Sequence, residues 1–243
     1  MSKHWNSILF SVAIVIAALV LANAFVNRNR TERQISVTGL GEKNFQSDLI
    51  VWMGSFTREN NDFKIASAEL KSNKFLIENY LTKNGVVKSD IVFSAINIQE
   101  LRKIKYSQTG EVSGDEFAGY KLTQSVEIRS KEIEKIEGIS RKITELLNEG
   151  VKFNSENPRY YYTKLATLKI VLVSEATKDA RERAEKIAEE SGSKIDELIS
   201  AQMGIIQITG QNSNDDYSWG GTYNTSSKDK TASITMKLIY KVK

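Results

Sequence analysis

The chain has 243 residues, with 34 basic and 30 acidic side chains, one histidine and no cysteine. Its 40% hydrophobic content is typical of a globular protein with a sizeable core. The lack of cysteine and the single His4 exclude thiol nucleophiles, Ser-His-Asp triads, disulfides and zinc sites built from thiolates and imidazoles. Because charges of both signs are interspersed, the net charge of +4 does not indicate a nucleic-acid-binding protein.

An apolar run opens the chain between Ile8 and Leu21, with Lys3 before it and Ala22-Asn23-Ala24 after it. A basic start, an apolar stretch and a small-x-small site are the parts of a secretory signal peptide, which would be cleaved after Ala24. Residues 8–26 together, about 19 in number, are also long enough for an uncleaved membrane anchor. Residues 1–26 are therefore predicted to be a signal peptide or a membrane anchor.

The basic residues around this run leave its topology open. Arg28, Arg30 and Arg33 follow the run, whereas only Lys3 and the α-amino group precede it. By the positive-inside rule, this asymmetry favours a cytoplasmic location for the following domain, in conflict with export.

The first part of the folded region is predicted to be a strand region, a helix and a hairpin. Residues 34–60 alternate with apolar residues on both faces, which indicates a strand pair or one long bent strand. Residues 61–85 have helical apolar spacing, with Asn61 or Asp62 as N-cap and Gly85 at C′. Residues 90–107 and 116–130 are two strands, joined by the loop "QTGEVSGD".

Two further helices are predicted downstream. Residues 131–150 place Ile133, Ile136, Ile143 and Leu147 on one face, between a Ser130 cap and a Gly150 stop. Residues 163–191 contain the strand-like "KIVLV", but apolar residues recur at three- and four-residue steps through the whole segment, so we predict one long helix stopped by Gly192. The alanines of this helix form a narrow ridge that a sheet can approach closely.

The carboxyl end is predicted to be a strand pair. Residues 194–210 lead into a loop, and residues 230–243 alternate almost without a break. No Pro, Gly or Ser linker divides residues 34–243, so we expect one folded α+β domain there. Its antiparallel sheet would pack against long amphipathic helices, behind the amino-terminal hydrophobic helix.

The stretch "VTGLGEKNF" resembles half of a dinucleotide-binding fingerprint through Gly39 and Gly41. That fingerprint needs a third glycine where Asn44 stands, followed by a helix, and a strand pattern follows instead. We therefore interpret both glycines as structural, permitting a bulge or tight bend, and expect no cofactor. Asn212, Asn214 and Asp216 mimic the first calcium-loop spacing but lack its glycine and glutamate, so no metal is expected.

The polar, glycine-rich loop of residues 209–230 carries Tyr217, Trp219 and Tyr223. These aromatics could contact a sugar, a peptide or a neighbouring subunit. Alternatively, they fold back on their own sheet at the tip of a mobile hairpin.

Four segments, "ISVTGLGEKNF", "KNGVVKSDIVFSAINIQ", "GYKLTQSVEI" and "EATKDARERAEKIAEESGSKI", resemble the SIMPL-domain family. The resemblance covers residues 34–243. That family includes bacterial periplasmic immunogenic proteins and proteins linked to oxidative-stress defence. The resemblance implies an α+β domain, export to the cell envelope, and ring-like oligomers in some members, and it supplies no catalytic residues.

The expected function is therefore that of a non-enzymatic cell-envelope protein, periplasmic or anchored facing the periplasm. It would act through self-assembly or protein contacts, in envelope or oxidative-stress defence. The alternative is a ligand-binding module that holds a glycan or amphiphile with Tyr217, Trp219 and Tyr223.

Overall fold

A computed structural model describes residues 2–28 and 33–243, with side chains described for residues 9–25 and 33–243. The chain divides into two compact units. The first unit comprises the described residues of 1–41 with 173–204 and 234–243, and the second comprises 42–172 and 205–233. Three elements continue from one unit into the other, so no linker marks the boundary in the sequence. For this reason the sequence predicts a single folded domain.

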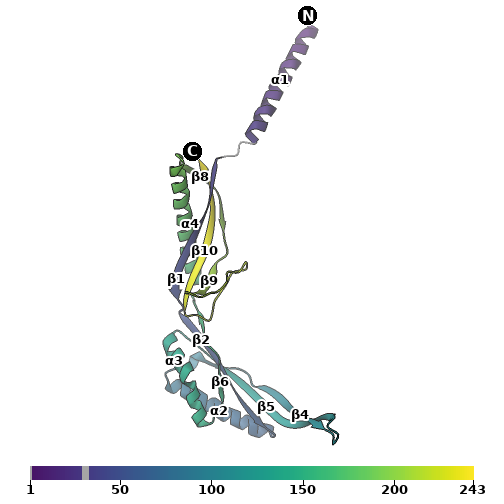
Figure 1. Ribbon diagram of the computed structural model, residues 1–243, viewed down its shortest axis with the longest axis vertical. Coiled ribbons are helices and arrows are strands. Elements are labelled where there is room, and N and C mark those ends of the chain that lie inside the picture. Colours follow the sequence, from purple (N-terminus) through teal and green to yellow (C-terminus); the bar gives the residue numbers. More distant parts are fainter. Residues whose placement is uncertain (1, 29–32) are drawn as a thin grey trace. The chain divides into compact units, whose positions relative to one another are not determined.

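The elements of the described residues follow one another as drawn in Figure 1. Their bounds are α1 Ser2–Arg28, β1 Gln34–Gln46, β2 Leu49–Asn60, α2 Phe63–Lys83, η1 Lys88–Asp90, β3 Ile91–Phe93, β4 Asn97–Tyr106, β5 Val112–Ser130, α3 Ile133–Lys142, η2 Ile143–Glu149, β6 Phe153–Ser155, β7 Arg159–Tyr161, α4 Leu165–Glu190, β8 Ile195–Met203, β9 Gln207–Gly210 and β10 Asp229–Val242. This content confirms the predicted α+β class.

The amino-terminal helix α1 contains the predicted apolar run. Its large apolar side chains between Leu9 and Phe25 are exposed. Within the described residues, no helix reaches both the length and the hydropathy of a membrane span. The side chains of Lys3, Arg28 and Arg30, on which the topology argument depends, lie outside the described ones.

The first unit contains the strand order β1, β10, β8, with β8 antiparallel to β10. β10 alternates as predicted, with Ile234, Met236 and Leu238 buried. The long helix α4 is confirmed and is followed by Gly192 at φ +69°. In this unit its alanines are buried at four-residue steps, at Ala176, Ala180, Ala184 and Ala188.

The second unit has its core between one face of a sheet and two helices. β2 and β5 are antiparallel neighbours over Ile50–Asn60 and Tyr120–Ser130, with β3 and β4 on the far side of β5. The buried residues of this sheet face and its helices form one cluster, which includes Trp52, Phe56, Leu122, Val126, Leu70, Ile77 and Ile136. The core of this unit therefore lies under α2 and α3.

Helix α2 begins and ends where the sequence predicts. The Asp62 carboxylate accepts hydrogen bonds from the backbone N–H groups of Lys64 and Ile65, which satisfies two free donors of the first turn. Gly85 follows at φ +83°.

The next helix differs from the prediction in two ways. Its N-cap is Glu132, and the predicted cap, Ser130, instead accepts a hydrogen bond from the Glu132 N–H. After Lys142 the chain tightens into the 3₁₀ segment η2, with three residues per turn. Leu146, three residues after Ile143, is therefore buried, and the predicted core residue Leu147 is exposed.

The predicted strand of residues 90–107 is divided into β3 and β4. The division occurs at Ser94, whose hydroxyl accepts from the Ser125 N–H and whose carbonyl accepts from the Gln124 side chain. The Ser94 N–H still donates to the Ser125 carbonyl at 2.9 Å, and regular pairing with β5 resumes at Asn97.

Candidate assembly surface and aromatic loop

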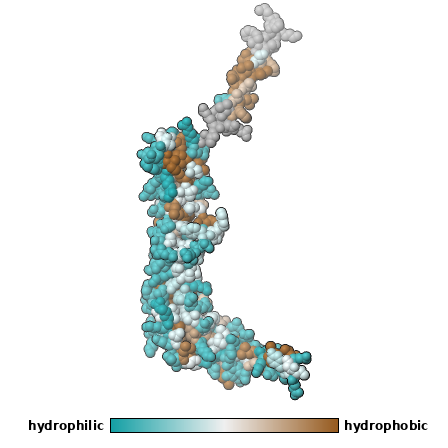
Figure 2. Space-filling view, viewed as in Figure 1, coloured by the Kyte–Doolittle hydropathy of each residue, from teal (hydrophilic) through white to brown (hydrophobic). Residues whose placement is uncertain are grey.

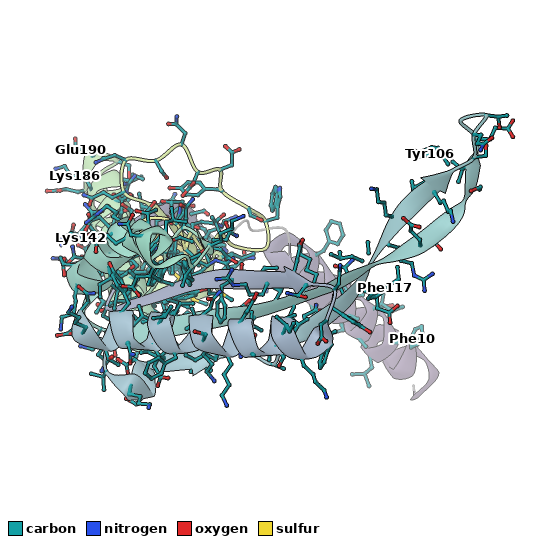
Figure 3. The ribbon with its side chains drawn as sticks, turned by 90° about the horizontal axis from the view of Figure 1, so that it is seen from below. Phe10, Tyr106, Phe117, Lys142, Lys186 and Glu190 are labelled. Carbon is teal, nitrogen blue, oxygen red and sulfur yellow. The ribbon has the colours of Figure 1, made fainter. Side chains whose placement is uncertain are left out.

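The β4–β5 ribbon extends past the end of the core of the second unit, as Figure 3 shows. β2 pairs with β5 only as far as Tyr120, and α2 begins at Phe63, whose ring lies 5.6 Å from that of Tyr120. Beyond this point β5 pairs with β4 alone. We call residues 97–118 the arm; its first residues, 97–100, still pair with the part of β5 that also pairs with β2.

One face of the arm carries most of its large apolar side chains, together with the charged Glu100, Arg102 and Asp115, and we call it the apolar face. Cross-strand pairing places Arg102 beside Phe117, Ile104 beside Asp115 and Tyr106 beside Val112. Directly paired residues of antiparallel strands point to the same side. Five large apolar side chains that pairing places on this side are each more than half exposed, namely Ile98, Ile104, Tyr106, Val112 and Phe117. Figure 2 shows hydrophobic surface on this ribbon.

This apolar face continues the buried face of the sheet. The rings of Phe117 and Tyr120 lie 5.1 Å apart, although strict alternation would put these two residues on opposite faces. A register shift between Leu101 and Arg102 leaves Ala118 as an extra residue and restores the alignment. Gly119, at φ +123°, adopts a backbone conformation that favours glycine beside this bulge.

The arm also has an open edge. Within the residues that the structure describes, β4 forms strand pairs only with β5, so its other edge has no strand neighbour over ten residues. Arg102 forms ion pairs on the apolar face: its Nη1 lies 3.2 Å from Asp115 Oδ1 of β5, and its Nη2 lies 3.7 Å from Glu100 Oε2 of the same strand. An uncovered apolar face next to an open edge is able to bind another chain.

The aromatic loop, residues 211–228, is held by one parallel β-bridge between Ile208 and Tyr223 and by polar side-chain contacts. The Gln207 side chain accepts from the Thr222 N–H at 2.9 Å and donates to the Ser218 carbonyl at 2.8 Å. Asp215 Oδ2 accepts from the Gly210 N–H at 2.8 Å and from Asn224 Nδ2 at 2.7 Å. These donors, above all the Gly210 N–H, lower the pKa of Asp215.

A buried lysine closes the base of this loop. Lys230 is fully buried, and its Nζ donates to the Asn224 carbonyl at 2.8 Å and to the Ser227 carbonyl. Burial lowers the pKa of Lys230 to about 8, partly opposed by the negative charge of Asp215. The buried ammonium thus reinforces the turn that the Ser227 N–H closes by donating to Asn224 Oδ1 at 2.8 Å.

The three predicted contact residues do not share one environment. Trp219 is 98% exposed and Tyr217 is 68% exposed. Tyr223 is 41% exposed, and its ring centroid lies 6.4 Å from that of Tyr161. Tyr223 thus folds back toward the sheet, whereas Tyr217 and Trp219 project from the loop.

The family model described as "SIMPL: Protein of unknown function (DUF541)" matches residues 35–237. The chain belongs to the SIMPL family. No curated protein matches the chain. The SIMPL match includes the arm and the aromatic loop.

Gly39 and Gly41 of the SIMPL domain lie buried on β1, with Gly39 against α4. A Cβ added at Gly39 would be 2.3 Å from the Ala176 carbonyl oxygen, so no side chain fits there. The next N–H, that of Leu40, donates to Asp179 Oδ2 at 2.8 Å, and this bond is the main cause of the lowered pKa of Asp179. Gly39 therefore allows the close approach of strand and helix.

The sequence reasoning missed the arm of the SIMPL domain. It predicts both strands but not that the cover of α2 ends at Phe63. The available signal was the set of apolar residues near the hairpin turn, including Tyr106 and Val112. Among the described residues, no group of three or more His, Cys, Asp or Glu side chains could hold a metal ion.

Proposed function

We propose that this SIMPL chain is a non-enzymatic cell-envelope protein that acts by self-assembly through the arm. The observation that carries the proposal is the uncovered apolar face of the arm, which continues the core face of the sheet beyond Tyr120. Exposed apolar surface of this kind is costly unless a partner covers it. The open β4 edge next to it adds unpaired backbone groups that a second strand can satisfy.

The location is also part of the proposal. The exposed apolar side chains of α1 between Leu9 and Phe25 favour an exported or membrane-anchored protein whose folded units face the periplasm. A role in envelope or oxidative-stress defence rests on the family resemblance. Fractionation of cells followed by amino-terminal sequencing tests this part, and intact chains recovered from the cytosol would contradict it.

Assembly is tested by the molar mass of the full chain in density-matched detergent at micromolar concentration. The wild type is expected to be oligomeric, and Ile104→Ser combined with Val112→Ser is expected to lower the mass, since both residues lie on the apolar face. The matched control is Tyr217→Ser with Trp219→Ser, which removes exposed apolar surface from the aromatic loop and should leave the mass unchanged. A monomeric wild type, or an oligomer insensitive to the arm variant, would overturn the proposal.

A second candidate function is ligand binding by the aromatic loop. It is favoured by the 98% exposure of Trp219 on a loop whose backbone is fixed by Gln207, Asp215 and Lys230. Fixed, exposed aromatic rings can stack on a sugar or insert into an amphiphile. Binding of the wild type to a glycan and lipid panel, lost on changing Tyr217, Trp219 and Tyr223 to alanine, would support this function. Unchanged binding of the triple variant would remove it.

A further inference from the structure

We propose that the arm pairs with the arm of a second copy of this chain, through antiparallel β4 edges related by a two-fold axis at Leu101. This inference rests on the proposed self-assembly and specifies its contact. The partner strand would extend the two-stranded ribbon into a four-stranded one, with β4 of each copy in the middle. The unpaired backbone groups on the open edge of β4 would then be satisfied by the other copy.

The sequence of β4 is self-complementary about Leu101. In an antiparallel pair with this centre, a residue a given number of positions before Leu101 lies opposite the residue the same number of positions after Leu101 in the other copy. Ile98 therefore faces Ile104 of the other copy, and Glu100 faces Arg102 of the other copy. Both kinds of pair stabilise neighbouring strands, and the two-fold axis produces each of them twice.

The same arrangement keeps the apolar faces together. Residues an even number of positions apart lie on the same side of a strand, and Ile98, Ile104 and Tyr106 share one side of β4. A two-fold axis perpendicular to the sheet preserves that side. The exposed apolar face of one arm thus becomes continuous with that of the other, so cross-strand contacts cover part of both.

Neighbouring registers lack this complementarity. An axis at Arg102 places that arginine opposite itself, and an axis at Glu100 does the same with two carboxylates. Like charges directly opposite each other destabilise a strand pair. Charge and apolar pairing therefore select the register centred on Leu101.

Cysteine cross-linking of the full chain measures the register, because the natural chain contains no cysteine. Leu101→Cys places two thiols directly opposite each other, with Cα atoms about 5 Å apart, within reach of a disulfide or a short bismaleimide. Gln99→Cys is the matched control on the same face of β4, where the two thiols would be about 14 Å apart. The Leu101 variant is expected to form covalent dimers and the Gln99 variant to remain uncross-linked.

Charge reversal measures the Glu100–Arg102 pair between copies. Glu100→Arg alone and Arg102→Glu alone each put like charges opposite one another, so each is expected to raise the dimer dissociation constant about tenfold or more. Mixing the two variants restores both opposite-charge pairs between unlike copies, whereas inside each chain the two charges remain alike. Recovery of association on mixing therefore reports the contact between copies. Lys105→Glu, which faces the neutral Asn97 of the other copy, is the control and should associate like the wild type.

The outcomes separate the register from the assembly itself. Cross-linking at Leu101 together with recovery on mixing supports the proposed pairing. An oligomer that cross-links at Gln99 instead, or that shows no recovery on mixing, overturns the pairing and leaves the proposed self-assembly standing. A monomeric wild type overturns both.

Discussion

The two halves of β5 have similar apolar content but opposite environments. From Tyr120 to Ser130 the strand lies between β2 and its neighbours under α2, and Leu122, Val126 and Ile128 are buried. From Val112 to Ala118 it lies beside β4 alone, and Val112 and Phe117 are exposed. The two segments differ in whether helix α2 packs over them. Because α2 begins at Phe63 beside Tyr120, it covers only the segment from Tyr120 onward. Apolar residues in a strand thus mark a surface that needs a partner, which can be the same chain or another one.

The largest loss of stability is expected at Gly39, where strand β1 packs most closely against helix α4. Gly39→Val would force a side chain into the backbone of α4, 2.3 Å from the Ala176 oxygen, and should lower the free energy of unfolding by about 3 kcal/mol or more. Thr38→Val, on the exposed face of the same strand, is the control and should change stability little. Denaturant unfolding measures both, and equal stability of the two variants would contradict the close packing.

The second prediction compares the two halves of the ribbon directly. Leu122→Ala removes a fully buried side chain and should cost about 3 kcal/mol of unfolding free energy. Ile104→Ala, in the arm, removes a side chain that is 53% exposed and should cost less than about 1 kcal/mol in dilute protein. If the arm variant were as destabilised as the core variant, the arm would be a covered surface.

The third prediction concerns the buried, charged side chain of Lys230. Lys230→Met leaves the Asn224 and Ser227 carbonyls without their donor and should cost about 2 kcal/mol. The Lys230 pKa, about 8 in the folded chain against an ordinary 10.5, means that the unfolded chain binds this proton more tightly. The free energy of unfolding should therefore rise with pH between those two values in the wild type.

The control is a comparison of the pH dependence of the two proteins. In Lys230→Met, the part of the rise in unfolding free energy that Lys230 causes should be absent, as measured by denaturant titrations at several pH values from 8 to 10. Tyr80 and Tyr160, whose pKa burial raises to about 12, act in the opposite direction only above about pH 10, so they do not mask it. An identical pH slope in both proteins would show that Lys230 titrates normally.

The smallest change in stability is expected at Gly138, a helical glycine with open space around it. Gly138 lies inside α3, and a Cβ there would meet no atom within 4 Å. Gly138→Ala should raise the free energy of unfolding by about 0.5–1 kcal/mol, because alanine loses less backbone freedom in a helix. Thermal unfolding measures the gain, and a loss of stability would mean that this face of α3 is covered.

The sequence predicts the elements whose patterns are set locally. The 3.6-residue period identifies α4 despite "KIVLV", because its buried alanines recur every four residues from Ala176 to Ala188. Asp62 and Gly85 define α2 by their capping chemistry. The misassigned Leu147 shows the limit of this reasoning, since tightening into η2 changes the period without a distinct sequence signal.

The candidate site was less predictable because it depends on distant contacts. The exposed aromatics Tyr217 and Trp219 were identified from the sequence, but not the buried Lys230 that holds their loop. The arm depends on where α2 stops and on a bulge at Ala118, and neither follows from alternation within β4 or β5. The division into two units is equally hidden, because β1 passes from one into the other after Gly41.

Amide hydrogen exchange of the full chain at several protein concentrations tests the central claim most directly. If the arm is a surface for a second copy, protection of the β4 amides will rise with concentration, while amides of the covered segment Leu122–Ile128 of β5 stay equally protected throughout. Protection of β4 that does not change from the nanomolar to the high micromolar range would contradict assembly through the arm.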